Sequence, residues 1–288
     1  MRSVPFRWNI ARREQLGKLV GEDPNIDSQL SKLIEPLRQA AARVLALGDE
    51  SDYAFIGRTP ENFYDYLSGI FDGISGAPDL HIVQFSLRWA GPGGLKSIPI
   101  EKRNALFDYL AEERVDPATL VSAPRPLALV DFVVDGGTME NFVKLLRLFA
   151  ERDGVDWNSV QRRLRIIGLR MRTKNSPNTW RWQQHQDWLN LIPDASIKNV
   201  SAPFDFLCYL GNNQPKLTRA HTPALWDRYD AETATHSELQ LQALNLAVRL
   251  FDLGRTKFER HSLARLIAKS HQIRQPATRK LVTMLKGA

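Results

Sequence analysis

One stretch decides the fold: Leu127-Ala-Leu-Val-Asp-Phe-Val-Val-Asp-Gly-Gly-Thr-Met139, followed by Glu140-Asn-Phe-Val-Lys-Leu-Leu-Arg-Leu-Phe149. The apolar run predicts a buried strand, the Asp-Gly-Gly-Thr segment a tight turn, and the residues after it an amphipathic helix. Such a turn leaves the free N–H groups of the helix N-terminus pointing outward, and Gly136 and Gly137 have no side chain to keep a phosphate away. The stretch therefore predicts an anion-binding loop.

Short apolar runs and helical segments alternate on both sides of this stretch. Strands are expected at residues 53–57, 80–88 and 164–171. Helices are expected around residues 101–113 and at 59–69, the latter with Thr59 as its N-cap. The alternation indicates an α/β protein with a central, mostly parallel sheet flanked by helices. Ligands bind such sheets at the carboxyl ends of the strands, which here are residues 57–60 and 135–138.

The chain divides into four predicted parts. Residues 1–50 form a helical lead-in, in which Pro36 is expected to kink or break a helix over 27–47. Residues 51–175 form the α/β core. Residues 176–235, rich in aromatic side chains and prolines, are expected to cap the open end of the sheet. Residues 236–288 form a helical C-terminal region with strong apolar periodicity.

Composition places the chain among ordinary globular proteins, because 43% of its 288 residues are hydrophobic and 25% are charged. It has no apolar run of about 18 residues or more, and Met1 to Trp8 do not resemble a signal peptide. We therefore expect a cytoplasmic protein with no membrane partner. The single cysteine, Cys208, excludes an internal disulfide and a thiolate metal site, and its apolar neighbours favour a core position over a nucleophile.

The net charge of +7 suits a polyanionic partner: nucleic acid, a phosphorylated small molecule or a membrane surface. Basic residues gather at 161–174 and again at 255–286. Both clusters are also compatible with solvated helix and loop faces that have no partner. The charge alone does not choose between these interpretations.

The order of elements, together with Val130-Asp-Phe-Val-Val-Asp-Gly-Gly-Thr-Met139, resembles the type I phosphoribosyltransferases. The signature of that family is four apolar residues, two acids, two apolar residues and a short Thr/Gly-rich loop that opens a helix. The resemblance covers about residues 50–175. It implies a glycosyltransferase that binds 5-phosphoribosyl-1-pyrophosphate or a nucleotide with Mg²⁺ and transfers the phosphoribosyl group to or from a nitrogenous base.

The resemblance also implies roles for individual residues. Asp131 would meet the ribose hydroxyls and the magnesium ion, and Asp135 would act as general base or contact the nitrogenous base. Arg58 would neutralise the pyrophosphate leaving group. The remaining residues expected to bind the ligand are Gly57 and Thr59 in the pyrophosphate loop, and Gly136, Gly137, Thr138 and Met139 in the 5′-phosphate loop. Residues 90–94 would correspond to the family's flexible loop.

The second acid of the signature is Phe132 here, and this departure keeps a second hypothesis open. In that hypothesis the fold is retained without catalysis, and the pocket senses a nucleotide or serves as an interaction module. Individual residues have alternatives too. Asp135 can simply cap the helix, and Arg58 can pair with Glu61 or Asp65.

A third hypothesis assigns the function to the basic surface, which would bind nucleic acid together with tryptophans that stack on bases. Trp180, Trp182 and Trp188 lie close together in the sequence, but their spacing does not place all three on one helix face, which favours core packing for at least one. A homo-oligomer is compatible with the sequence under every hypothesis.

Overall fold

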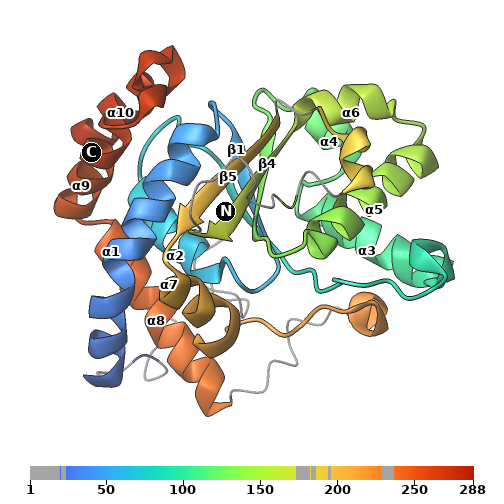
Figure 1. Cartoon of the computed structure of the whole chain (residues 1–288), viewed down its shortest axis with the longest axis horizontal. Coiled ribbons are helices and arrows are strands. Elements are labelled where there is room, and N and C mark those ends of the chain that lie inside the picture. Colours follow the sequence, from blue (N-terminus) through green and yellow to red (C-terminus); the bar gives the residue numbers. More distant parts are fainter. Residues whose placement is uncertain (1–19, 21–23, 173–181, 183–185, 194–195, 229–236) are drawn as a thin grey trace.

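The computed structural model describes residues 20, 24–172, 182, 186–193, 196–228 and 237–288. These residues form an α/β fold around a five-stranded, all-parallel sheet with the strand order β2-β1-β3-β4-β5 (Figure 1). The strands are β1 (Asp52–Ile56), β2 (Leu80–Val83), β3 (Leu127–Phe132), β4 (Leu164–Met171) and β5 (Ile197–Ala202). The fold class predicted from the sequence is confirmed.

The quoted stretch supplies the central strand. In β3 the first five residues are buried, as expected for a strand covered on both faces. It pairs with β1, where Phe55 lies opposite Val130, and with β4, where Ile167 lies opposite the same residue. The chain moves from β1 outward to β2 and then back past β1 to β3. The direction of winding therefore changes between β1 and β3, and ligands bind at such switch points.

Two layers of helices cover the sheet, and Figure 1 shows them on its two sides. One layer holds α1 (Pro24–Leu47), α2 (Glu61–Phe71), α8 (Glu238–Gly254), α9 (Lys257–Ala268) and α10 (Pro276–Gly287). The other holds α3 (Ile100–Glu112), α4 (Pro117–Ser122), α5 (Gly137–Asp153) and α6 (Trp157–Arg163). The short elements are η2 (Gly94–Ser97), η4 (Asp187–Leu191), α7 (Phe204–Cys208), the π-helical turn η6 (Tyr209–Asn213), η7 (Pro223–Arg228) and η9 (His271–Arg274). Each layer closes its own apolar core against one face of the sheet.

Helices α2 and α8 pack backbone against backbone. Every residue of α2 is buried. A Cβ added to Gly69 would lie 2.0 Å from the carbonyl oxygen of Phe251, and one added to Gly254 would lie 2.4 Å from that of Tyr66. The two glycines therefore let the helices approach more closely than any side chain would allow, and α8 completes the burial of α2.

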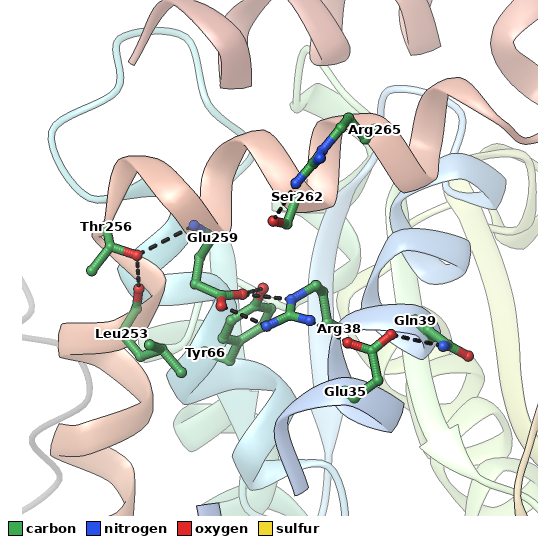
Figure 2. Close-up of polar contacts among 9 residues, drawn as sticks. All are labelled: Glu35, Arg38, Gln39, Tyr66, Leu253, Thr256, Glu259, Ser262 and Arg265. Carbon is green, nitrogen blue, oxygen red and sulfur yellow. Dashed lines mark hydrogen bonds and ion pairs between the residues drawn. The ribbon is translucent and has the colours of Figure 1, made fainter. Parts of the chain in front are cut away.

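A buried ion pair joins the N-terminal and C-terminal helices (Figure 2). Arg38 of α1 donates from Nε and Nη2 to the two carboxylate oxygens of Glu259 in α9, at 2.7 and 2.6 Å. The hydroxyl of Tyr66 in α2 donates to the same carboxylate at 2.8 Å. Glu259 is only 1% exposed, so its charge is balanced inside the protein by this fork-shaped arrangement. These contacts fix the positions of α1, α2 and α9 relative to one another.

Three local expectations differ from the structure. Pro36 does not break the helix over 24–47, which is continuous through that residue. Helix α2 begins at Glu61, and the Thr59 side chain does not cap it. The strand expected at 80–88 ends at Val83, because the next N–H groups leave the sheet: that of Gln84 donates to the Tyr109 hydroxyl, and that of Ser86 to the carbonyl of His221.

Strand β5 was not predicted, since it lies in the stretch assigned to the cap. Its residues alternate between exposed and buried, as at an edge strand, and Lys198, Asn199 and Ser201 interrupt its apolar pattern. The predicted boundaries of the four parts remain predictions. Among the residues described, no helix combines the length and apolar character needed to span a membrane.

Candidate functional site

The candidate site lies at the carboxyl ends of β1 and β3, where the winding direction changes. Two adjoining cavities of about 390 and 330 Å³ open there. They share Thr59, Arg88, Asp131, Thr138 and Gly211 along their walls. Each volume lies within the range of small-molecule sites. All nine residues predicted for the site, namely Gly57, Arg58, Thr59, Asp131, Asp135, Gly136, Gly137, Thr138 and Met139, line one cavity or both.

The loop before α5 presents backbone donors to the larger cavity. Gly136 is the N-cap of the helix, with φ of +90°, and its carbonyl accepts the first helical hydrogen bond from Glu140 at 2.8 Å. The N–H of Gly137 donates to Asp135 at 3.2 Å. Within the described chain, the N–H groups of Thr138 and Met139 have no acceptor. The helix N-terminus therefore offers two donors and a positive dipole to an anion.

Packing explains both glycines of the loop. A Cβ at Gly136 would lie 2.9 Å from the Trp182 ring, and one at Gly137 would lie 2.5 Å from the carbonyl oxygen of Arg88. The positive φ of Gly136 adds a conformational reason, because side chains rarely adopt that backbone region. The sequence correctly located the tight turn, while the predicted approach of a phosphate to these glycines stays a prediction.

Asp135 is held in a fixed position by Arg88. The guanidinium donates to one carboxylate oxygen from Nη2 at 2.5 Å and from Nε at 3.2 Å. This hydrogen bond lowers the pKa of Asp135, so the group is charged near neutral pH. Because Asp135 precedes the N-cap and binds the N–H of Gly137, it braces the turn rather than capping the helix. No sequence pattern marks Arg88, which precedes the glycine-rich residues 90–94.

Asp131 is the buried acid of the site. It lies near the end of β3, is 7% exposed, and accepts a hydrogen bond from the N–H of Phe132 at 2.7 Å. Burial raises the pKa of the Asp131 carboxyl to about 8, against the smaller opposing effects of that hydrogen bond and of Lys216. Phe132, which replaces the second acid of the resemblance, lines the larger cavity and packs against Gly211. Asp131 therefore stands without a neighbouring acid on its strand.

Lys216 is a site residue that sequence reasoning missed. Its ammonium donates to the carbonyl of Arg58 at 3.3 Å and to that of Leu210 at 2.5 Å, and it lines the smaller cavity. Burial lowers the pKa of Lys216 to about 8. The residue stands in a proline-containing stretch without periodicity, where no pattern marks it. It brings a second cation into the pocket that contains Arg58.

Glu61 fixes the segment that carries this lysine. Its carboxylate accepts from the N–H of Leu217 at 3.0 Å and from the N–H of Thr218 at 3.2 Å, and it also binds the Thr218 hydroxyl. Gln214 donates to the carbonyl of Arg58 at 3.1 Å. These bonds tie residues 210–218 over the turn after β1. Glu61 is therefore engaged with backbone, and Arg58 forms no ion pair with a carboxylate in the described chain.

The aromatic residues near the site belong to the core. Trp182 is fully buried and donates to the Asn199 side chain at 2.9 Å. Its ring stacks on that of Trp188, with centroids 6.0 Å apart. Neither ring is available to a base, and Trp180 lies outside the described residues. Cys208, expected in the core, is half-buried and lines the larger cavity.

Among the described residues, no group of three or more histidine, cysteine or acidic side chains could hold a metal. The carboxyl of Asp131 fits a Mg²⁺ ion that takes most of its ligands from phosphate oxygens and water, as this ion commonly does. Comparison of the chain with protein-family models, with curated proteins and with solved structures gave no match. What is shown is an α/β fold with a five-stranded parallel sheet and a polar, cation-lined depression at its switch point.

Proposed function

We propose that this protein binds 5-phosphoribosyl-1-pyrophosphate or a nucleotide at the β1/β3 switch point and transfers the phosphoribosyl group to or from a nitrogenous base. One observation carries the proposal. The helix N-terminus of α5, the turn after β1 and the buried Asp131 all face the same pair of cavities. 5-Phosphoribosyl-1-pyrophosphate has a phosphate at one end, a pyrophosphate at the other and ribose hydroxyls between them, which would match these three parts of the site in turn.

The 5′-phosphate would lie at the start of α5. The N–H groups of Thr138 and Met139 and the Thr138 hydroxyl can together satisfy several phosphate oxygens. The helix dipole adds about 0.3–1 kcal/mol for an anion at this position. Asp135, which would otherwise repel the phosphate, is neutralised by Arg88. The larger cavity thus suits a monoester phosphate at its α5 end.

The pyrophosphate end would lie in the smaller cavity. Arg58 and Lys216 both line this space and both carry positive charge, while Gly57 turns the chain with φ of +75°. In ribosyl transfer the departing pyrophosphate gains negative charge as the anomeric carbon becomes cationic. Fixed cations at that position stabilise the developing charge without needing to reorganise. Arg58 and Lys216 are therefore the proposed leaving-group contacts.

Asp131 and Asp135 would contact the remaining groups of the substrates, the ribose hydroxyls and the nitrogenous base. Asp131 would accept a hydrogen bond from a ribose hydroxyl between the two anion sites, and a bound Mg²⁺ would supply further neutralisation of the pyrophosphate. Asp135 is a charged acceptor with a lowered pKa, which suits recognition of a base N–H better than proton abstraction near neutral pH. We accordingly assign Asp135 to base recognition.

Calorimetry with the pyrophosphorylated sugar tests the proposal. Wild-type protein should bind it in the presence of Mg²⁺, and Asp131→Ala should weaken binding at least tenfold, the equivalent of about 1.4 kcal/mol. Asp108→Ala is the matched control, since this carboxylate on α3 is largely exposed and lines neither cavity. Absence of wild-type binding, or equal effects of the two substitutions, would refute the assignment.

Phe132 favours a second candidate, in which the same pocket binds the ligand without turnover. Its ring occupies the cavity wall where the resembling family has a second acid. The two candidates separate in one assay of pyrophosphate release over a panel of nitrogenous bases. Release that is lost in Arg58→Ala supports transfer, whereas tight binding without release supports the sensing role.

A further inference from the structure

The positive charge of this protein is concentrated at one end of the chain. Residues 255–288 carry nine lysine and arginine side chains and a single carboxylate, that of Glu259. The other 254 residues carry 30 basic and 31 acidic side chains. The segment that forms α9, η9 and α10 therefore carries a net charge of +8, and the rest of the chain a net charge of −1.

The only carboxylate side chain of this segment does not reduce its surface charge. Glu259 is 1% exposed and is bound by Arg38 and Tyr66. Figure 2 shows it pointing toward these two residues, while Arg265 of the same helix lies away from them. Two cations of the segment are balanced by carboxylates elsewhere in the described chain: Arg255 by Asp72 at 2.9 Å and Lys280 by Glu50 at 3.0 Å.

Three of the remaining cations surround a hollow in the surface. Lys257, Phe258, His261 and Arg265 of α9 line it together with Lys286 of α10. The volume of the hollow is about 570 Å³. In the described chain, no carboxylate side chain lies within 4 Å of the three cations that line it. The hollow is therefore a cationic pocket without an internal counterion.

An aromatic ring lies at the edge of this hollow. Phe258 is 67% exposed, and it is the one large hydrophobic side chain of residues 255–288 with such exposure. The apolar faces of both helices are turned inward instead, with Leu263, Ile267 and Leu285 fully buried. Two of the lining side chains make local hydrogen bonds: the His261 ring bonds to the carbonyl of Lys286 at 3.2 Å, and Arg265 donates to the Ser262 hydroxyl at 3.0 Å.

We propose that the hollow between α9 and α10 binds single-stranded nucleic acid. Phosphates would contact Lys257, Arg265 and Lys286, and a base would stack on the Phe258 ring, the combination found in sequence-tolerant single-strand binders. An anionic membrane fits less well, because a helix lying on a bilayer inserts an apolar face, and here only one apolar ring is offered. The hollow shares no residue with the switch-point cavities, so this inference is independent of the proposed function.

Fluorescence anisotropy with labelled single-stranded RNA and DNA oligonucleotides of about twelve nucleotides tests the inference. Lys257→Gln, Arg265→Gln and Lys286→Gln combined should weaken binding at least tenfold. They should also reduce the slope of log K against log salt concentration by about 2, since each lost phosphate contact removes about 0.7. Phe258→Ala should weaken single-strand binding about fivefold or more and leave duplex binding unchanged.

The control variant combines Lys144→Gln, Arg147→Gln and Lys198→Gln, which removes the same charge from partly or fully exposed positions on α5 and β5, none of which lines the hollow. It should retain wild-type affinity and slope. The proposal is overturned if wild-type protein does not bind either oligonucleotide at low salt, or if the control weakens binding as much as the triple variant. Binding to phosphatidylserine vesicles without binding to oligonucleotides would assign the surface to membranes instead.

Discussion

Asp131 carries a carboxyl group whose charged form is disfavoured by burial. It is 7% exposed at the end of the central strand, and burial raises its pKa to about 8. A group whose charged form is destabilised by folding costs stability whenever it is ionised. Such a cost is common at sites where a buried acid serves a ligand. The cost in stability can be measured directly at this residue.

Asp131→Asn should stabilise the protein in alkaline solution. The raised pKa means that the folded state retains a proton which the unfolded state loses above about pH 4. The ionisation of Asp131 therefore removes stability from the wild type progressively between about pH 4 and pH 8, and the variant lacks this contribution. Unfolding by urea at several pH values should show the advantage of the variant growing over this window to a few kcal/mol. Asp108→Asn, at an exposed carboxylate, should show no such trend.

Gly136 and Gly154, which lie at the two ends of α5, form a matched pair for testing how tightly the loop before the helix is packed. Both have positive φ, +90° and +67°, but a Cβ at Gly136 would strike the Trp182 ring while nothing lies within 4 Å of one at Gly154. Gly154→Ala should cost about 1 kcal/mol of stability from backbone strain alone. Gly136→Ala should cost at least about 1 kcal/mol more, because the Trp182 ring must move. Equal losses in thermal or chemical unfolding would show that the tryptophan contact is not restrictive.

At the level of elements, a buried charge network joins helices that are far apart in the sequence. Arg38, Tyr66 and Glu259 belong to α1, α2 and α9 (Figure 2). Removing one partner leaves the other charge buried and unbalanced, which typically costs about 3–5 kcal/mol. Removing both partners eliminates the burial cost along with the attraction, so the double change is less harmful than the sum of the single changes.

A double-mutant cycle should reveal this coupling. Arg38→Met and Glu259→Met should each destabilise the protein strongly, and the pair should show a coupling energy of about 2 kcal/mol or more. The partly exposed pair of Glu140 and Lys144, one turn apart on α5, is the control, where the same cycle should give about 0.3–0.5 kcal/mol. A coupling energy for Arg38 and Glu259 as small as the control would mean that the pair adds nothing to the docking of α9.

Elements with strong periodic patterns were predictable from the sequence, and elements defined by tertiary contacts were not. The continuous apolar run of β3 and the glycine turn after it locate both the central strand and the loop at the start of α5. Strand β5 escapes detection because an edge strand can be half polar. Lys216 escapes because its position depends on Glu61, 155 residues earlier in the sequence, which holds the segment over β1.

At the scale of the whole molecule, a buried histidine limits tolerance to acid. His221 is 5% exposed, and burial lowers its pKa to about 4. Its carbonyl accepts from Ser86 and from the Trp226 indole, so the backbone around it is fixed on both sides. As the pH falls, His221 is protonated in the unfolded state before it is protonated in the folded state, and this difference favours unfolding.

The contribution of His221 to the free energy of unfolding should accordingly decline as the pH falls from about 6.5 to about 4, opposite in sign to the contribution of Asp131 over the same window. The unfolded histidine gains a proton over this window while the folded one stays neutral, and the contribution reaches at most about 3 kcal/mol. Compared with the wild type, His221→Leu should lack this contribution to the slope in the same range, whatever its effect on stability at neutral pH. His271→Leu, at an exposed histidine, should not change the slope in this way, and an equal change there would contradict the assignment.

The backbone contact between α2 and α8 has a consequence for synthesis. Helix α2 leaves the ribosome about 170 residues before α8, the helix that completes its burial. Because synthesis proceeds at about 5–20 residues per second, the apolar surface of α2 remains uncovered by α8 for roughly 10–30 s. During that interval the nascent chain exposes an apolar helix whose packing partner has not yet been synthesised. Newly made protein should therefore depend on chaperones that hold hydrophobic segments, even though the finished molecule conceals α2 completely.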